Sequence, residues 1–239
     1  MIINSFQIKR YLLIPCVIIV CCAHIYAQEN PIESYLKQAG DYAEIYTGRI
    51  ETEYSRAQYE NFPYYLSNND FSEAAIVYKN KYYPNLRARL DLFKEQLIIL
   101  PYEKRLGVVV DSQNIDRVYM YDKTFIWLNL PKESGIKTGF YLQLFNSEKI
   151  QLFSKNIFNL LHRHHTIFYF DRKTRYYLFF ANRYHNVNNK NSFSKLFPQY
   201  KKQINQFSKD HKLNFKNNAE ESLTSLAGYC EELIKSTNK

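Results

Sequence analysis

The spacing of apolar residues divides this chain into three regions. Residues 11–23 form an uncharged apolar run, and residues 74–187 contain short runs rich in β-branched and aromatic residues. After position 193 the apolar residues recur at helical spacing. These patterns predict a targeting segment, a set of β-strands and a group of helices, in that order.

The middle region predicts an antiparallel β-meander. Its connections at residues 79–81, 146–148 and 182–183 are too short for a crossover, so the strands on either side must run antiparallel. Pro84 predicts a bulge or an edge position. The predicted strands are residues 74–78, 82–92, 97–100, 106–110, 118–121, 125–128, 139–145, 149–154, 166–170, 175–181 and 184–187.

The last region predicts two or three helices. Its first apolar residues lie around Pro198, which is expected to open the longer of two helical pieces. Asn218 and Glu221 have the spacing of a capping box, with Asn in place of Ser or Thr, and precede an apolar stripe that ends at Ile234. That stripe is expected to pack on the sheet or on the preceding helix. The asparagine-rich residues 186–192 predict a flexible joint between the sheet and the helices.

The predicted fold class is therefore α+β. It consists of an antiparallel β-meander, forming a strongly curved sheet or a partial barrel, followed by a C-terminal pair or trio of helices. The predicted domains are residues 28–187, which begin with a helix over residues 31–39 closed by Gly40, and residues 188–239, a helical segment packed on or near the sheet. The sequence leaves open whether the sheet closes.

The apolar run near the N-terminus has the features of a signal peptide. Lys9 and Arg10 precede it, the small Ala27 follows it, and the run is shorter than the roughly 20 apolar residues of a membrane-spanning helix. We therefore expect residues 1–27 to be removed, so that the mature chain begins at Gln28 and has no integral membrane span. The expected location is the periplasm or cell envelope, or outside the cell as a secreted protein.

The distribution of cysteines is consistent with removal of this segment. Cys16, Cys21 and Cys22 would leave with it. The remaining Cys230 lies on the apolar helical stripe, which predicts a buried apolar side chain rather than a disulfide or a reactive thiol. Lipid attachment at Cys21 or Cys22 is an alternative, but branched residues precede them where such sites carry small residues.

The mature chain is expected to be basic, because loss of the signal peptide subtracts only two charges from the formal net charge of +9. Basic residues are concentrated between positions 171 and 216, which suits contact with an anionic membrane surface or an acidic envelope protein. Nucleic acid is not expected as a partner outside the cytoplasm. A solvated helix surface is the alternative interpretation. The candidate contact residues are Lys201, Lys202, Lys209 and Lys212.

The best candidate for metal chemistry is a cluster of histidines. On a strand, His162 and His164 would share a face, and with His165 nearby they could begin a zinc or copper site. Arg163 places a positive charge beside them, and Asp171 is the nearest acid. The competing interpretation is a polar, exposed connection. No cofactor is predicted.

No catalytic residue is predicted. The chain contains no Gly-x-Ser-x-Gly, no His-Glu-x-x-His and no glycine-rich phosphate loop. Asp111, Asp116 and Asp122 recur near predicted strand ends, where paired carboxylates would suit a glycosidase. Turns also favour Asp, because its side chain accepts hydrogen bonds from nearby backbone N–H groups, and we interpret the three as turn residues.

Aromatic residues are abundant, with 22 Tyr and 17 Phe. On the surface of a sheet, aromatic rings suit binding of carbohydrate, peptide or lipid, whereas inside the sheet they form an ordinary core. Composition does not distinguish these roles.

Several short signatures occur in order along residues 41–233: Ile45-Tyr46-Thr47-Gly48, Phe62-Pro63-Tyr64-Tyr65, Val77-Tyr78-Lys79-Asn80-Lys81-Tyr82-Tyr83, Gly139-Phe140-Tyr141, Ser194-Lys195-Leu196-Phe197-Pro198 and Lys212-Leu213-Asn214-Phe215. In these signatures the chain resembles a family of exported, uncharacterised β-rich proteins of Bacteroidetes-type bacteria. The resemblance implies a cell-envelope location and Lys-rich terminal helices, and it implies no activity. Asn182-Arg183 departs from the glycine-containing turn usual in such proteins, which affects the turn type and not the topology.

Together these features predict an exported, non-enzymatic cell-envelope protein that binds another envelope component or is accessory to it. The enzyme alternative is a hydrolase of envelope polysaccharide or peptide, which requires acids that converge in one cleft. A small-ligand carrier is the third alternative, and it requires a sizeable apolar cavity inside the sheet.

Overall fold

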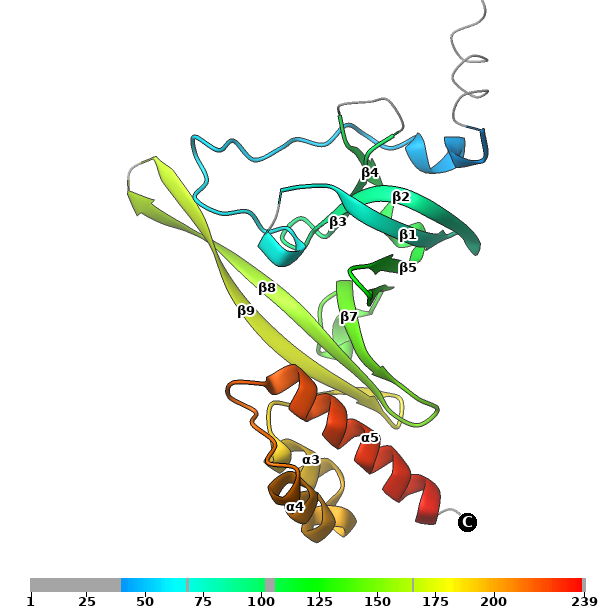
Figure 1. The fold of residues 1–239 in the computed structure, drawn as a ribbon, viewed down its shortest axis with the longest axis vertical. Helices are drawn as coiled ribbons and strands as arrows, with labels where there is room; N and C mark the ends of the chain where they lie inside the picture. The colour runs from blue at the N-terminus through cyan, green and yellow to red at the C-terminus, as the bar shows by residue number, and fades with distance from the viewer. Residues whose placement is uncertain (1–39, 68, 102–105, 165, 238–239) are drawn as a thin grey trace, which may run out of the picture. The chain divides into compact units, whose positions relative to one another are not determined.

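The computed structural model describes residues 40–67, 69–101, 106–164 and 166–237 (Figure 1). The chain divides into two units, residues 1–43 and residues 44–239. Of the first unit only residues 40–43 are described, and they begin the 3₁₀-helix η1 (Gly40–Tyr46). The predicted signal peptide and the predicted helix over residues 31–39 lie outside the described residues.

A sheet of ten antiparallel strands makes up most of the second unit, which confirms the predicted fold class. The order of strands is β10-β9-β8-β7-β6-β5-β1-β2-β3-β4, so the sheet is open, with β10 and β4 at its edges. The meander is interrupted once, because the chain passes from β4 back to the centre, where β5 pairs with β1. The strands are β1 (Ser72–Tyr78), β2 (Lys81–Asp91), β3 (Gln96–Ile99), β4 (Val108–Val110), β5 (Ile115–Met120), β6 (Lys123–Leu128), β7 (Gly139–Asn146), β8 (Gln151–His164), β9 (Ile167–Phe180) and β10 (Arg183–Asn186).

Pairs of residues with left-handed backbone form the tight hairpin turns. Lys79 and Asn80, with φ of 49° and 62°, connect β1 to β2. Ala181 and Asn182, with φ of 49° and 60°, connect β9 to β10. Such pairs match the right-handed twist of the flanking strands. The second turn lies one residue earlier than predicted, because β10 already begins at Arg183.

Pro84 lies at a bulge, as predicted. The register between β1 and β2 shifts between Ala74 and Ile76, and Asn85 on the opposite strand has a left-handed backbone with φ of 53°. Proline has no N–H to donate to a ladder, and the bulge removes the need for one at this position.

Strands β8 and β9 extend far beyond their predicted limits. Each has 14 residues and they pair along almost their whole length, whereas the pattern predicted residues 149–154 of the first and residues 166–170 and 175–181 of the second. Residues 159–163 and 172–175 are exposed. An apolar pattern detects only strand residues with a buried face, so it does not predict these exposed parts of β8 and β9. Backbone hydrogen bonds between the two strands stabilise them instead.

The C-terminal helices follow the prediction. They are α3 (Lys190–Leu196), the 3₁₀-helix η5 (Pro198–Tyr200), α4 (Lys201–Asp210) and α5 (Ala219–Thr237). Residues 186–192 are not a loose linker, because the Asn189 side chain accepts hydrogen bonds from the N–H groups of Asn191 and Ser192 and caps α3. The remaining short helices are η2 (Tyr65–Ser67), η3 (Ser112–Asn114) and η4 (Lys132–Ser134).

One hydrophobic core joins these helices to the sheet. The predicted apolar stripe of α5 packs against both the sheet and the preceding helices through this core. Cys230 lies in it with 0% exposure, and burial raises the pKa of its thiol to about 12. The prediction of a buried apolar cysteine is confirmed. The core contains Ile150, Leu152, Leu178, Val187, Phe193, Phe197, Ile204, Leu223, Leu226, Ala227 and Cys230.

Residues 49–60, here called the strap, connect two distant edges of the sheet without forming a strand (Figure 1). At one end Ile50 bridges to Val108 of β4, and at the other Tyr59 bridges to Phe168 of β9, where β10 does not cover β9. Backbone hydrogen bonds of 2.8 to 2.9 Å reinforce both contacts. The strap therefore covers parts of both edges that would otherwise leave backbone groups unpaired.

Gly48 immediately precedes the strap and permits its approach to β4. A Cβ atom on Gly48 would lie 1.8 Å from the carbonyl oxygen of Val109. Since a backbone atom cannot yield as the end of a side chain can, only glycine fits here.

We expect Gly48→Ala to lower the free energy of unfolding by about 1–3 kcal/mol, as at other overpacked positions. Denaturant unfolding followed by circular dichroism measures this loss. Gly228→Ala is the matched control. Gly228 lies within α5, and the methyl group added there would lie 3.7 Å from the side chain of Phe145 in β7, which is an ordinary contact distance. If Gly48→Ala were as stable as the unsubstituted chain, the strap would not approach β4 this closely.

Candidate functional site

Two members of the predicted histidine cluster, His162 and His164, lie at the end of β8. His162 is exposed, and its ring centroid lies 4.3 Å from that of Phe168. His164 is the last residue of β8, and His165 lies outside the described residues. Arg163 forms an ion pair with the strap. Among the described residues, no three His, Cys, Asp or Glu side chains are grouped so that they could hold a metal ion.

The predicted lysines lie on α4 and immediately after it. Lys201, Lys202, Lys209 and Lys212 are all exposed, and none forms an ion pair with another residue in the described part of the chain. Helix α4 buries Ile204 instead. The four residues therefore form a solvent-facing basic surface.

Two of the three predicted turn acids are confirmed. The Asp111 carboxylate accepts a hydrogen bond from the Gln113 N–H (3.2 Å) and caps η3, and Asp122 lies in the β5–β6 turn with φ of 55°. The prediction is wrong for Asp116, which lies within β5 with its side chain exposed. The chain turns before it, at η3, so Asp116 occupies a solvent-facing strand position.

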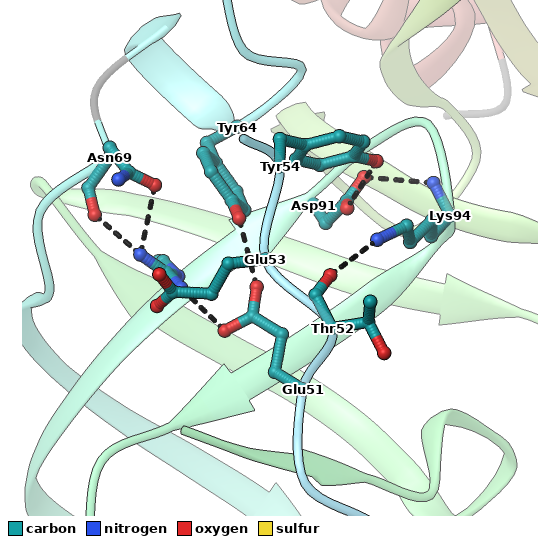
Figure 2. Close-up of polar contacts among 9 residues, drawn as sticks. Glu51, Thr52, Glu53, Tyr54, Tyr64, Asn69, Asp91 and Lys94 are labelled. Carbon is teal, nitrogen blue, oxygen red and sulfur yellow. Dashed lines mark hydrogen bonds and ion pairs between the residues drawn. The ribbon is translucent and has the colours of Figure 1, made fainter. Parts of the chain in front are cut away.

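A buried arginine joins the strap to the sheet, and Figure 2 labels the strap residues Glu51 and Glu53 that it contacts. Arg89 of β2 donates from Nη2 to Glu51 Oε2 (2.5 Å) and to Glu53 Oε1 (2.6 Å), both in the strap. The side chains of Arg89 and Glu51 are 3% and 2% exposed. The ring centroids of Tyr64 and Phe71 lie 4.7 and 4.4 Å from the guanidinium carbon, and the Tyr64 hydroxyl donates to Glu51 Oε1 (2.9 Å). We call Arg89, Glu51 and Glu53 the arginine clamp.

Further contacts connect the strap to the loop between β2 and β3 (Figure 2). The Tyr54 hydroxyl donates to Asp91 Oδ2 (2.8 Å). The Lys94 ammonium donates to the Thr52 carbonyl (2.9 Å) and lies 4.0 Å from the centroid of the Tyr54 ring. Burial raises the pKa of Tyr54, which keeps its hydroxyl a donor, and burial also raises the pKa of Asp91.

The same loop supplies a second ion pair, between the buried Lys155 and the half-buried Glu95. Lys155 Nζ of β8 donates to Glu95 Oε1 (2.5 Å) and to the Phe140 carbonyl (2.9 Å), and the Phe140 N–H donates to Glu95 Oε2 (2.7 Å). Burial raises the pKa of Glu95 and lowers the pKa of Lys155. A Cβ atom on Gly139 would lie 2.5 Å from the Glu95 carboxylate, which explains why glycine stands there.

The carboxylates of Glu51, Glu53, Asp91 and Glu95 are already bonded to donors within the protein. Arg89 holds two of them, and Lys155 holds a third. Asp91 also accepts hydrogen bonds from the N–H groups of Phe93 (2.9 Å) and Lys94 (2.8 Å). A general acid or base must be able to exchange a proton with a ligand. We therefore assign these groups a structural role.

A groove of about 960 Å³ lies on the surface of the sheet. The start of β1, the bulged part of β2 and the β5–β6 turn form its walls. Tyr82, Tyr119 and Tyr121 line it with exposed fractions of 58%, 37% and 36%, and every other tyrosine in the described part of the chain is less exposed. Ala75 pairs with Tyr119, and its small side chain leaves space beside the ring. We call this the tyrosine groove.

The charges around the tyrosine groove balance. Its lining contains two acids, Glu73 and Asp122, and two bases, Arg87 and Lys123. Arg87 donates to the Phe71 carbonyl (3.1 Å). The other three form no ion pair with any described residue, so their charged atoms are available to a ligand.

The arginine clamp supports one wall of the tyrosine groove. Arg89 Nη1 donates to the carbonyl and the side-chain oxygen of Asn69 (2.6 and 2.9 Å), between the strap and β1. Tyr65, from the same part of the chain, packs against Tyr121 with ring centroids 5.8 Å apart. The hydroxyl groups of Ser72 and Tyr121 share a hydrogen bond. The position of Tyr121 therefore depends on contacts that begin at the clamp.

Sequence reasoning singled out neither the arginine clamp nor the tyrosine groove. For the clamp, the available signal was a charged Arg89 between the apolar residues Ala88 and Leu90 of a predicted strand, since a buried charge requires a partner. For the groove, the signal was the adjacent pair Tyr82 and Tyr83, because neighbouring strand residues face opposite sides of the sheet.

Comparisons with known protein families, with curated proteins and with solved structures find no significant match to this chain. No helix in the described ranges combines the length and the apolar composition needed to cross a membrane.

We expect Arg89→Met to lower the free energy of unfolding by about 3–5 kcal/mol, because the buried Glu51 carboxylate loses its partner. Urea unfolding measures the loss. Lys79→Ala is the control: it breaks an exposed pair with Glu44, whose members are 48% and 45% exposed, and should cost less than about 1 kcal/mol. The double variant Arg89→Met, Glu51→Gln should be more stable than Arg89→Met alone. Equal losses for Arg89→Met and Lys79→Ala would contradict the clamp.

Proposed function

We propose that this protein is a non-enzymatic binding or accessory protein of the cell envelope, and that its ligand contacts the tyrosine groove. One observation carries the proposal: the three exposed tyrosines of the described residues all line the same hollow. Single exposed apolar groups are ordinary on a protein surface, whereas clustered ones mark binding sites.

The lining of the groove favours a neutral ligand rich in hydroxyl groups, such as a segment of envelope polysaccharide. A tyrosine ring offers an apolar face and a polar hydroxyl, which suits the C–H and O–H groups that alternate around a sugar ring. The two acids and two bases supply hydrogen-bond acceptors and donors without a net charge. A strongly charged ligand would therefore gain little long-range attraction.

The two alternative functions have weaker support. A hydrolase needs a pair of carboxyl groups that converge on its substrate. Glu51, Glu95 and Asp91 are bonded to Arg89, Lys155 and Tyr54, so this alternative rests on the two exposed acids of the tyrosine groove, Glu73 and Asp122. A carrier needs an apolar cavity inside the sheet. Large buried side chains occupy the interior, among them Tyr64, Tyr83, Phe125, Phe140, Tyr141 and Phe153.

Two features of the sequence support a cell-envelope location. Residues 1–27 have the charge and apolar pattern of an export signal. The basic surface formed by Lys201, Lys202, Lys209 and Lys212 is the proposed contact with an anionic membrane surface or an acidic envelope protein. Its exposure and its lack of ion pairs within the described residues favour this role.

We expect the double variant Tyr82→Ala, Tyr119→Ala to lose binding to neutral oligosaccharides by about 10-fold or more, since each ring contributes roughly 0.5–1.5 kcal/mol of contact. A glycan array that carries neutral and anionic oligosaccharides, followed by titration calorimetry, measures this. Leu160→Ala, Leu161→Ala is the control, because it removes two exposed apolar side chains from β8. If the array showed no neutral ligand, or both variants bound alike, the groove would not be the binding site.

We expect the full chain, expressed in a Gram-negative host, to be recovered from the envelope fraction with Gln28 as its first residue. Mass spectrometry of the purified product identifies that residue. Lys202→Glu, Lys209→Glu should move the membrane-associated share into the soluble periplasmic fraction, because repulsion replaces attraction to anionic lipid. Uncleaved chain in the cytoplasm would contradict export. Unchanged membrane association of the charge-reversed variant would contradict the proposed lysine contact but would leave export unaffected.

A further inference from the structure

The edge of the sheet at β10 carries hydrogen-bonding groups that no other part of the described chain uses. β10 is the terminal strand and pairs only with β9. The Val187 N–H donates to the Tyr176 carbonyl (3.0 Å), one step beyond the end of this ladder. Because hydrogen-bonded and non-hydrogen-bonded pairs alternate, His185 directs its backbone groups toward β9, whereas Tyr184 and Asn186 direct theirs away from it.

These outward backbone groups border a hollow of about 600 Å³. Its lining includes Tyr184, His185 and Asn186 but no residue of β9, so the hollow lies on the free side of β10. Helix α3 contributes Lys195 and Leu196 to the lining. A hollow between a sheet edge and a helix suits an extended peptide, which binds by adding a strand.

The lining of this hollow favours an acidic peptide. It contains no Asp or Glu, while Lys195 is exposed and pairs with no acid among the described residues. Asn188 and Asn191 add side-chain amides that can both donate and accept hydrogen bonds. A second copy of this chain fits less well, because pairing β10 with β10 would bring two Lys195 side chains toward each other.

We propose that β10 binds an extended, acidic segment of a partner protein, which joins the sheet as an added edge strand. The backbone of that segment pairs with Tyr184 and Asn186, and an acidic side chain meets Lys195. The site is separate from the tyrosine groove, and the proposal does not depend on the function assigned to that groove.

The test uses the full chain and a phage-displayed library of random decapeptides, with synthetic copies of the enriched peptides titrated by fluorescence anisotropy. Asn186→Pro removes an outward N–H without touching the ladder to β9, as proline on an edge strand permits. Asn186→Ala removes the same side chain but keeps the N–H. We expect enriched peptides rich in Asp and Glu to bind Asn186→Ala within about twofold of the original affinity, and Asn186→Pro about fivefold or more weakly.

Lys195→Glu provides an independent variant, which keeps the proposal testable if Asn186→Pro fails to fold by circular dichroism. It should weaken the same peptides by about tenfold or more, because it reverses the charge that faces them. Failure to enrich acidic peptides, or unchanged binding by Lys195→Glu, would overturn the proposal. So would equal affinity of folded Asn186→Pro and Asn186→Ala. The chain could also form a dimer that the Asn186→Pro substitution converts to a monomer. That result would identify a second copy of the chain as the occupant of the β10 edge and would overturn the proposal.

Discussion

The buried ion pair between Arg89 and Glu51 is the contact on which the arrangement of the strap depends. Neither charge can leave water alone without a large cost, so the pair and the docked strap must form together. Once docked, the strap places Tyr54 against Asp91 and brings Tyr59 to the uncovered part of β9. The sheet is thus open in its strand order, yet parts of two edges are held by one segment.

Polar groups in this molecule divide into two sets with different roles. The buried set is paired donor to acceptor, as in the contacts of Lys155 with Glu95, and it fixes loops and strands in place. The exposed set around the tyrosine groove includes Glu73, Asp122 and Lys123, which have no ionic partner among the described residues. A surface whose charges are unpaired but balanced is suited to hydrogen-bonding a neutral molecule.

Local features of the fold were predictable because they depend on neighbouring residues. The left-handed turn at Lys79 and Asn80, the bulge at Pro84 and the apolar face of α5 each follow from a few adjacent positions. The strap was not predictable, because residues 49–60 have no periodic pattern and Glu51 meets an arginine 38 residues away. The groove was hidden for another reason: β2 carries tyrosines on both faces, and only the packed sheet shows that Tyr82 faces water while Tyr83 does not.

The strap also constrains the order in which the chain can fold. Its β4 end needs residues up to about position 110, whereas just beyond its other end the Asn61 amide donates to the carbonyl of Phe170, 109 residues later. Closing so long a loop costs conformational entropy before any contact offsets it. During synthesis, the strap therefore emerges early but completes its contacts late. Until β9 arrives, the Tyr59 ring lacks its stacking partners Phe168 and Phe170, and the nascent chain must carry an aromatic segment whose contacts are incomplete.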